Sequence, residues 1–303
     1  SWINARGGRW HNALQLGRQA LISSDFYQPL DAEQHFFVQP TVAFERYLED
    51  LYLDTDRLAD YTFQEGYAQV DAGINFSTRA QARIGVRSGR VEAKLRTGVP
   101  GLPEADWLTD TRAQFQFTYD SRDVVELPTR GMFVNLRYLD SQDWFGGEQD
   151  YRIAEGIIVP SFNVGGDSLS LILGGGSLLS GENPLNEQIE LGGIRTFPGL
   201  RPGELRGSDY WFAGASYLKR LTDLAPVFGQ SVYAGVRLQA GEMRSDTGLL
   251  DSGTLYGFSG SLTGLTPLGP FLLSLGYVVD RTVRLQFAIG RPVWEGSILD
   301  TLH

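Results

Sequence analysis

Apolar and polar side chains alternate along the last third of the chain, and this pattern constrains the fold more than any other feature. In residues 283–290 one face reads Val, Leu, Phe and Ile, and the other reads Arg, Gln, Ala and Gly. Similar alternation occupies residues 232–239, 256–262 and 271–280. Because successive side chains of a β-strand point to opposite sides, a period of two predicts strands. Helical patterns are lacking, so the chain is predicted to be all-β.

The alternation does not say which face meets water. A soluble β-sandwich buries its apolar face, whereas a transmembrane barrel turns that face toward lipid and its polar face toward the lumen. Two features of the strands favour the barrel. The polar faces mix Arg and Gln with many Gly and Ser, and aromatic residues lie near strand ends, as in an interfacial girdle. We therefore predict a transmembrane antiparallel β-barrel, with a soluble β-protein as the alternative.

Composition and charge narrow the class of protein further. No apolar run approaches the roughly 18 residues of a transmembrane helix, so a membrane crossing would require a closed barrel. The net charge of −10 argues against nucleic-acid binding. Acidic residues gather in presumed loops, whereas basic residues lie on polar strand faces, which indicates a partly basic lumen. These basic residues are Arg83, Arg87, Lys94, Arg96, Arg112, Arg137, Arg237 and Arg284.

The strand pattern runs through the whole chain without a domain boundary, which predicts one barrel domain over residues 1–303. An extended segment is expected at 9–29, an acidic loop at 50–57, and a β-bulge or a tight hairpin at Ser88–Arg90, where the apolar phase shifts. Further strands are expected at 36–45, 58–76, 80–97, 112–120, 132–143, 150–163, 168–180, 209–221, 230–242, 254–264, 270–279 and 282–292. The total is about 13–14 strands. Bacterial barrels normally have an even number, so we expect an N-terminal truncation with strands missing there.

Signatures of catalysis are missing from the sequence. The histidines (His11, His35 and His303) have no suitable Ser/Asp neighbours, and Gly257-Phe258-Ser259-Gly260-Ser261 fails the nucleophile-elbow pattern at its last position. No P-loop and no His/Cys set with metal-ligand spacing occurs. We expect no enzyme activity, no cofactor and no metal site in this segment.

A long Gly/Pro-rich segment at residues 182–208 interrupts the strands. Loops of this length inside a compact domain are usually functional or disordered. This one combines aromatic and apolar residues with Arg and Gly, so we predict that it folds into the lumen. An ordered surface loop is the alternative.

Two motifs give the chain a resemblance to the bacterial surface antigen superfamily, which holds BamA-type assembly barrels and two-partner-secretion transporters. Gly192-Gly193, a short gap and then Phe197-Pro198-Gly199-Leu200 resemble the lumen-loop motif of that family, and five strands follow. Asp120 to Gly131, with Pro128 before its end, resembles a periplasmic turn of the family. The resemblance implies a sixteen-stranded barrel in the outer membrane of a Gram-negative bacterium, with the 182–208 loop in its lumen.

The loop departs from the family pattern at the position of the family's lumen arginine, which is Pro198 here. The acidic partner on the wall is also missing, because the corresponding stretch reads Gln239-Ala240-Gly241. Either Arg195 or Arg201 could form a substitute pair with Glu204 or Glu242, or Phe197 could hold the loop by packing. The resemblance therefore assigns the loop residues Gly192, Gly193, Arg195, Phe197, Pro198, Gly199, Leu200, Arg201, Gly203 and Glu204, the wall residues Arg237, Gln239, Gly241 and Glu242, and the turn residues Asp120, Pro128 and Gly131.

The variant Phe-Pro-Gly-Leu-Arg-Pro-Gly-Glu at 197–204, together with Phe26-Tyr27-Gln28-Pro29-Leu30, most resembles the barrels of patatin-like (type Vd) autotransporters. This implies a C-terminal translocator that secretes or anchors its own N-terminal phospholipase passenger. The implied partners are the passenger, a POTRA domain, outer-membrane lipids and lipopolysaccharide, and periplasmic chaperones with the barrel-assembly machinery; a homodimer stays open. The alternatives are a barrel-assembly insertase, a porin-like channel and a lipid-active outer-membrane enzyme.

Overall fold

A computed structural model describes residues 4–289, apart from 54–55, 99–100, 126, 185, 195, 224–230, 246–250, 267–268 and 282. Within this part, fourteen strands form one sheet in which each strand pairs with its neighbours in chain order. The strands are β1 (Arg9–Gln15), β2 (Ala20–Pro29), β3 (Phe36–Leu53), β4 (Asp56–Ser77), β5 (Ala80–Gly98), β6 (Ala105–Asp120), β7 (Gly131–Ser141), β8 (Tyr151–Val164), β9 (Asp167–Gly181), β12 (Asp209–Asp223), β13 (Ser231–Arg244), β14 (Leu255–Thr266), β15 (Gly269–Val278) and β16 (Val283–Ile289).

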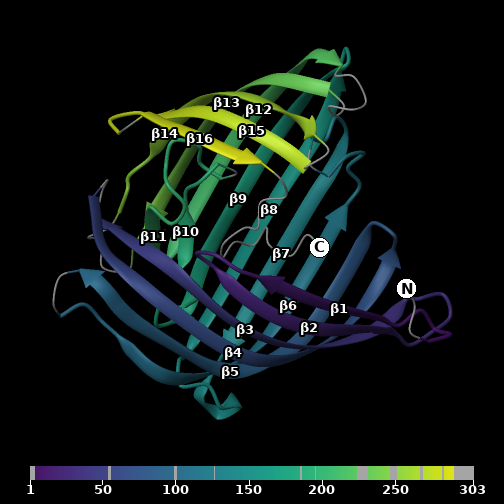
Figure 1. The fold of residues 1–303 in the computed structure, drawn as a ribbon, viewed down its shortest axis with the longest axis vertical. Coiled ribbons are helices and arrows are strands. Elements are labelled where there is room, and N and C mark those ends of the chain that lie inside the picture. The colour runs from purple at the N-terminus through teal and green to yellow at the C-terminus, as the bar shows by residue number, and fades with distance from the viewer. Residues whose placement is uncertain are drawn as a thin grey trace.

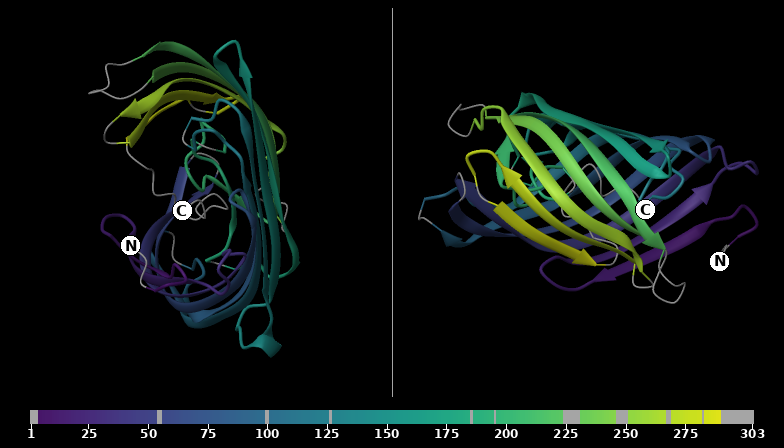
Figure 2. Two further views of the ribbon diagram at one scale, coloured as in Figure 1. Left: turned by 90° about the vertical axis from the view of Figure 1, so that its right-hand side faces the viewer. Right: turned by 90° about the horizontal axis from the view of Figure 1, so that it is seen from above.

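The sheet curls around a central space, with β1 to β6 forming one wall and β12 to β16 the opposite wall (Figures 1 and 2). Among the described residues, no pairing joins β1 to β16, so these strands form the edges of the sheet. The predicted all-β barrel fold with about 13–14 strands is confirmed. The helical turn η1 (Asp143–Phe145) is too short to span a bilayer, and the described residues contain no helix that could.

We name the two ends of the sheet by their connections. The loop end carries residues 182–208, and the turn end carries the 121–130 connection between β6 and β7. The strand ranges expected for β7 to β9 and for β12 to β16 agree with those of the structure to within a few residues where they are described.

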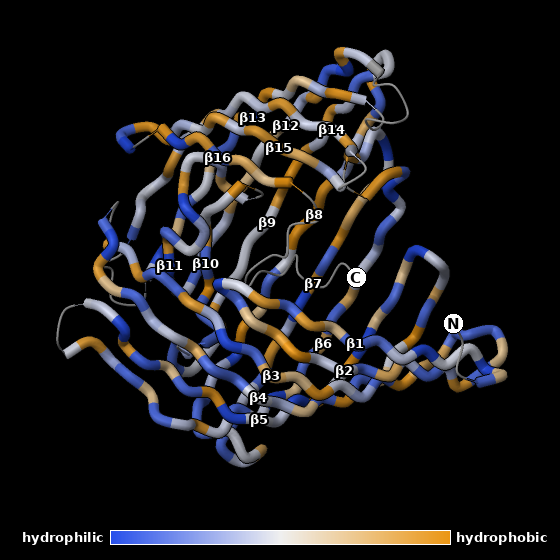
Figure 3. Tube along the Cα trace, in the orientation of Figure 1, coloured by the Kyte–Doolittle hydropathy of each residue, from blue (hydrophilic) through white to orange (hydrophobic). Residues whose placement is uncertain are grey.

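The apolar face of the sheet points outward, as the barrel prediction requires. On β16, the side chains of Val283, Leu285, Phe287 and Ile289 are all more than half exposed, whereas those of Arg284 and Gln286 point inward onto the loop. Figure 3 shows the resulting alternation of apolar and polar residues along the strands. An outward apolar face of this extent is stable in lipid and not in water.

The phase shift expected at Ser88–Arg90 has a different cause from the one predicted. Pairing of β5 with β4 continues through Ser88, Gly89 and Arg90 without a register shift, so both the bulge and the hairpin are wrong there. Ile84 and Val86 point outward, 63% and 44% exposed, while Val91 and Ala93 point inward and are buried. The pleat is unbroken, and the apolar residues change from the outward to the inward side, as expected for a strand that passes from lipid into water.

Beyond this boundary the loop ends of β3 to β6 enclose an apolar cluster on their inner side. Its buried members are Ala59, Tyr61, Phe63, Val91, Ala93 and Ala105. The hydroxyl of Tyr61 donates to the carbonyl of Pro103 at 2.9 Å and so attaches the β5–β6 connection to the cluster. In this part of the sheet, as in a soluble protein, the apolar side chains are buried on the inner side.

Two expectations for the N-terminal third are wrong. The segment 9–29 is a hairpin in which Arg9 pairs with Tyr27 and Gln15 with Leu21. Most of the expected acidic loop at 50–57 belongs to β3 and β4. There Asp50 is neutralised by Arg18 at 2.7 Å and Arg57 at 3.4 Å.

Candidate functional site: a loop held inside the sheet

Residues 182–208 leave the loop end of β9 and return to β12 through the space that the sheet encloses. The segment contains a short hairpin of β10 (Ile189–Leu191) and β11 (Leu205–Gly207). Figures 1 and 2 show this hairpin within the curve of the main sheet. Ile189, Leu191, Phe197 and Leu200 are essentially fully buried, so the segment is a packed element of the interior.

The tip of the loop, residues 192–204, is folded by its own backbone. Phe197 N–H donates to the Gly193 carbonyl at 2.9 Å, and Leu200 N–H donates to the Phe197 carbonyl at 3.1 Å. Gly192 has a φ of 146°, and a Cβ there would lie 2.1 Å from the Arg201 carbonyl oxygen. The first glycine of the motif is therefore required by a close backbone approach.

Phe197 fills a socket made by glycines on the wall. A Cβ at Gly241 on β13 would lie 3.1 Å from the Phe197 ring, and one at Gly257 on β14 would lie 3.0 Å from it. At Gly276 on β15, a Cβ would meet the Gly199 nitrogen at 2.5 Å. Three neighbouring strands thus lack side chains where the loop tip lies against them.

Polar side chains of the same wall donate hydrogen bonds to carbonyl groups of the loop tip. Arg237 Nη2 donates to the Thr196 carbonyl at 2.6 Å, and Gln239 Nε2 donates to the Pro198 carbonyl at 3.0 Å. From β16, Arg284 Nε donates to the Gly199 carbonyl at 3.1 Å. The wall recognises the backbone of the loop, which explains how the tip can be held although position 198 is a proline.

A buried ion pair also joins this wall to the loop. Glu204, 4% exposed, places Oε2 3.2 Å from Arg284 Nη2 and Oε1 3.4 Å from Arg281 Nη1. Its Oε2 also accepts the Arg201 N–H at 2.8 Å. The acid lies on the loop and the arginines lie on the wall, the reverse of the arrangement that the resemblance implies.

The remaining candidates for a substitute pair have other surroundings where the structure describes them. Arg195 lies outside the described residues. Arg201 places its guanidinium over the Tyr52 ring, 5.0 Å from the centroid. Glu242 points away from the loop and pairs with Arg244 at 2.7 Å, so its expected role as a lumen partner is wrong.

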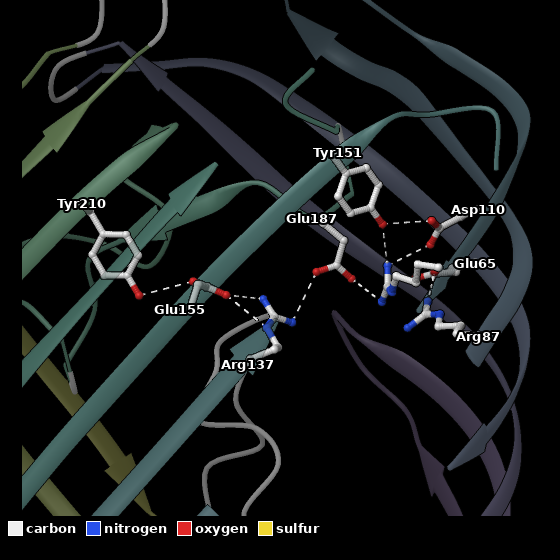
Figure 4. A network of polar contacts seen from close by, with 9 residues as sticks. Glu65, Arg87, Asp110, Arg137, Tyr151, Glu155, Glu187 and Tyr210 are labelled. Atoms are coloured by element: carbon white, nitrogen blue, oxygen red, sulfur yellow. Dashed lines mark hydrogen bonds and ion pairs between the residues drawn. The ribbon is translucent and has the colours of Figure 1, made fainter. Parts of the chain in front are cut away.

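A second anchor, which the sequence reasoning missed, lies at Glu187 (Figure 4). Its carboxylate lies 2.6 Å from Arg112 Nη2 on β6 and 3.4 Å from Arg137 Nη1 on β7. Burial alone would raise the pKa of Glu187, but the charges of these arginines outweigh it and hold the pKa at about 2.

Both arginines are themselves fixed by other lumen groups. Arg112 also contacts Asp110 at 2.9 Å and the Tyr151 hydroxyl at 3.2 Å, while Arg137 pairs with Glu155. A buried arginine with one partner would be costly, so these additional contacts make the network stable. No local sequence pattern links these positions, which is why only the structure could reveal them.

A third anchor joins the loop to the N-terminal wall. Arg206 of β11 pairs with Glu190 of β10 and reaches Glu49 on β3 at 2.9 Å. The loop therefore connects β3, β6 and β7 on one side with β13 to β16 on the other.

The space around the loop is not uniformly polar or basic. An apolar cluster combines loop residues with inward side chains of β7 to β9 and β12 to β15, including Phe133, Ile153, Ile157 and Phe212. Lys94 and Arg96, expected in a basic lumen, instead lie on the outward face of β5, and Lys94 pairs there with Glu92. Arg83, Arg87, Arg112, Arg137, Arg237 and Arg284 do point inward.

In the 121–130 turn, Asp123 accepts more backbone N–H groups than Asp120, the acidic residue that the resemblance assigned to the turn. Asp123 accepts the N–H groups of Val124, Thr129 and Arg130 at 2.9–3.2 Å. Asp120 pairs with Arg122 at 2.6 Å. Of the other predicted turn residues, Pro128 accepts the Ser168 hydroxyl through its carbonyl at 2.6 Å, and Gly131 has a φ of 108°.

One group of residues has the composition of a cation site. Asp31, Glu33 and His35 bring ligand atoms within 4.8 Å of one another in the β2–β3 turn. Asp31 already accepts the N–H groups of His35 and Phe36 at 3.0 and 2.8 Å, so the cluster has an ordinary role in turn formation.

An inside-out sheet with a loop packed in its interior defines a transmembrane β-barrel with an inserted loop. The chain belongs to the Omp85 superfamily, whose domain model matches residues 5–292. It is accordingly an outer-membrane barrel of the Gram-negative type.

Solved structures agree with this assignment at the level of the fold. BamA from Haemophilus ducreyi lacking POTRA domains 1–3 matches with a TM-score of 0.77 at 12% identity, over 93% of this chain and 63% of that one. CdiB from Escherichia coli matches with a TM-score of 0.61 at 14% identity, over 89% of this chain and 52% of that one. The chain thus spans between half and two thirds of the length of these relatives. A comparison with curated protein sequences finds no match.

Proposed function

We propose that residues 1–303 form the translocator domain of an outer-membrane secretion protein, and that the 182–208 loop is the element that controls its passage. The observation that carries this proposal is the attachment of the loop to both walls by Glu187, Glu204 and Arg206. The loop is held both by apolar packing and by these ion pairs. Water would solvate the charged groups once the loop leaves its site, whereas a loop held only by apolar packing would expose apolar surface.

The cargo in this proposal is an N-terminal patatin-like phospholipase passenger, together with a POTRA domain before the barrel. The support is the loop sequence Phe197 to Glu204, which resembles that secretion class. The loop end would then face the cell exterior. Periplasmic chaperones and the barrel-assembly machinery would bring the chain to the membrane.

The direct test removes residues 194–207 from the full-length protein and measures passenger display by protease accessibility on intact cells. We expect display to be lost while heat-modifiable gel mobility shows that a barrel is still present. A matched control exchanges Glu242 and Arg244 at the rim for Gln, which leaves the loop contacts intact.

Cells that carry the 194–207 deletion also distinguish the alternative functions. Unchanged display with slower assembly of other outer-membrane barrels would indicate an insertase. A rise in ion conductance in planar bilayers, with display unchanged, would indicate a porin-like channel.

A further inference from the structure

The outward face of β3, β4 and β5 contains a sharp boundary between apolar and charged residues. Phe44 pairs across the sheet with Gly66, which in turn pairs with Arg90, so these residues form one row. Toward the turn end the outward residues are apolar, such as Val42 and Val70. Toward the loop end most of them are polar or charged, such as Arg46, Gln64 and Lys94.

Two exposed arginines flank this boundary. Arg46 lies one outward position beyond Phe44 on β3, and Arg90 lies two strands away on β5. Between them is Gly66, where a Cβ would meet only the Phe44 ring, at 3.5 Å. The missing side chain leaves a shallow gap between the Phe44 ring on β3 and Arg90 on β5, and Arg46 lies diagonally across it toward the loop end.

The acidic neighbours of these arginines have other partners. Glu92 is buried and contacts Lys94 at 2.6 Å and Gln64 at 3.1 Å. Glu148, which also feels the charge of Arg90, has its pKa lowered chiefly by the Thr109 N–H. Among the described residues neither Arg46 nor Arg90 forms an ion pair, so both guanidinium groups are available to an external anion.

We infer that Arg46 and Arg90 bind a phosphate group of lipid A in the outer leaflet. Guanidinium groups form paired hydrogen bonds with phosphate oxygens and match their planar geometry. The acyl chains below the phosphate would lie against Phe44, Val42 and Val70, and the sugar layer would lie beside the projecting ends of β3 to β5. The inference rests on the proposed orientation, in which the loop end faces outward.

The test measures retention of purified lipopolysaccharide by the full-length protein in detergent, using native mass spectrometry. Changing Arg46 and Arg90 together to Gln should weaken retention at least about tenfold, the size expected for loss of charge-assisted hydrogen bonds. The control changes Arg6 and Arg79 to Gln, because both are exposed at the turn end and the net charge changes equally. Heat-modifiable mobility verifies folding, and Lys at 46 and 90 should restore part of the binding.

A second probe identifies the phosphate. Lipid A stripped of its phosphates should bind the native protein and the Arg46/Arg90 variant equally. Equal loss of lipopolysaccharide in both variant pairs, or no loss in either, would overturn the inference. Loss of phosphatidylglycerol binding in place of lipopolysaccharide would show that this end faces the inner leaflet. None of these readouts depends on secretion, so failure of the proposed function would be seen separately.

Discussion

Oε2 of Glu204 lies 3.2 Å from Nη2 of Arg284, and this pair joins the lumen loop to the last strand of the sheet. The carboxylate is almost completely shielded from solvent, with Arg281 as its second partner. A buried carboxylate needs its charged partners, and Glu204 contacts two arginines. These contacts should therefore determine the position of the loop tip.

Changing Glu204 to Gln should release the loop tip. Removal of one partner from a buried ion pair costs about 3–5 kcal/mol, because the remaining charge loses its compensation. Urea unfolding in detergent micelles measures the loss, and limited proteolysis should begin to cleave between residues 192 and 204. Glu242→Gln is the control, since solvent screens its pair with Arg244 and the change should leave stability nearly unchanged. Equal effects of the two changes would mean that the Glu204 contacts do not hold the loop.

Filling the glycine socket should displace Phe197. In Gly257→Ala the new methyl group would lie 3.0 Å from the ring, so we expect a destabilisation of about 1–3 kcal/mol. The smaller side chain of Phe197→Leu should recover part of this loss in the double variant, which a double-mutant cycle would measure. Gly260→Ala on the same strand is the control, because nothing lies within 4 Å of the added Cβ. Strict additivity of the two changes would contradict the proposed contact.

The Glu187 anchor should make the loop sensitive to acid. The folded pKa of Glu187 is lowered from 4.5 to about 2, so its contribution to stability is present above about pH 4.5 and disappears as the pH falls toward 2. The shift corresponds to a contribution on the order of 3 kcal/mol.

The comparison is between the native protein and Glu187→Gln across that pH range. Their difference in free energy of unfolding should be large at pH 6 and should shrink steadily below pH 4.5. Glu182→Gln, at an exposed position of the same loop, controls for the loss of one carboxylate from the loop. A difference that stays constant down to pH 2.5 would rule out the ion pairs as its source.

The turn between β6 and β7 should depend on Asp123 more than on Asp120. Asp123→Ala removes the acceptor of three backbone N–H groups and should cost about 1–2 kcal/mol. Asp123→Asn keeps one acceptor oxygen and should cost less. If Asp120→Ala proved the more damaging change, the assignment of the turn would have to return to the residue that the family pattern suggested.

The amino-acid sequence predicted the fold well because a period of two is a local property of each strand. It was less successful where the solvent changes along one strand. In β5 the apolar residues shift from Ile84 and Val86 to Val91 and Ala93, and the sequence pattern predicts a bulge or a tight hairpin for this shift. A strand that passes from lipid to water produces the same pattern without any break in pairing.

The contacts of the loop were harder to predict for a second physical reason. Glu187 meets Arg112 and Arg137 across gaps of dozens of residues, and only the curvature of the sheet brings them together. The glycines at 241, 257 and 276 could have been a signal, because each interrupts the inward face of a strand. Their shared contact with residues 197–199 becomes visible only when the three strands are side by side.

The central claim is that the loop tip lies against the β13 wall inside the barrel, and distance-limited cross-linking in native outer membranes tests it most directly. The chain has no cysteine, so Pro198→Cys can be combined with Gln239→Cys on β13 or, as a control, with Gln114→Cys on β6. A short bifunctional thiol reagent should join 198 to 239 rapidly, shown by altered gel mobility, and should leave 198 and 114 unjoined. Equal cross-linking of both pairs, or of neither, would contradict the account.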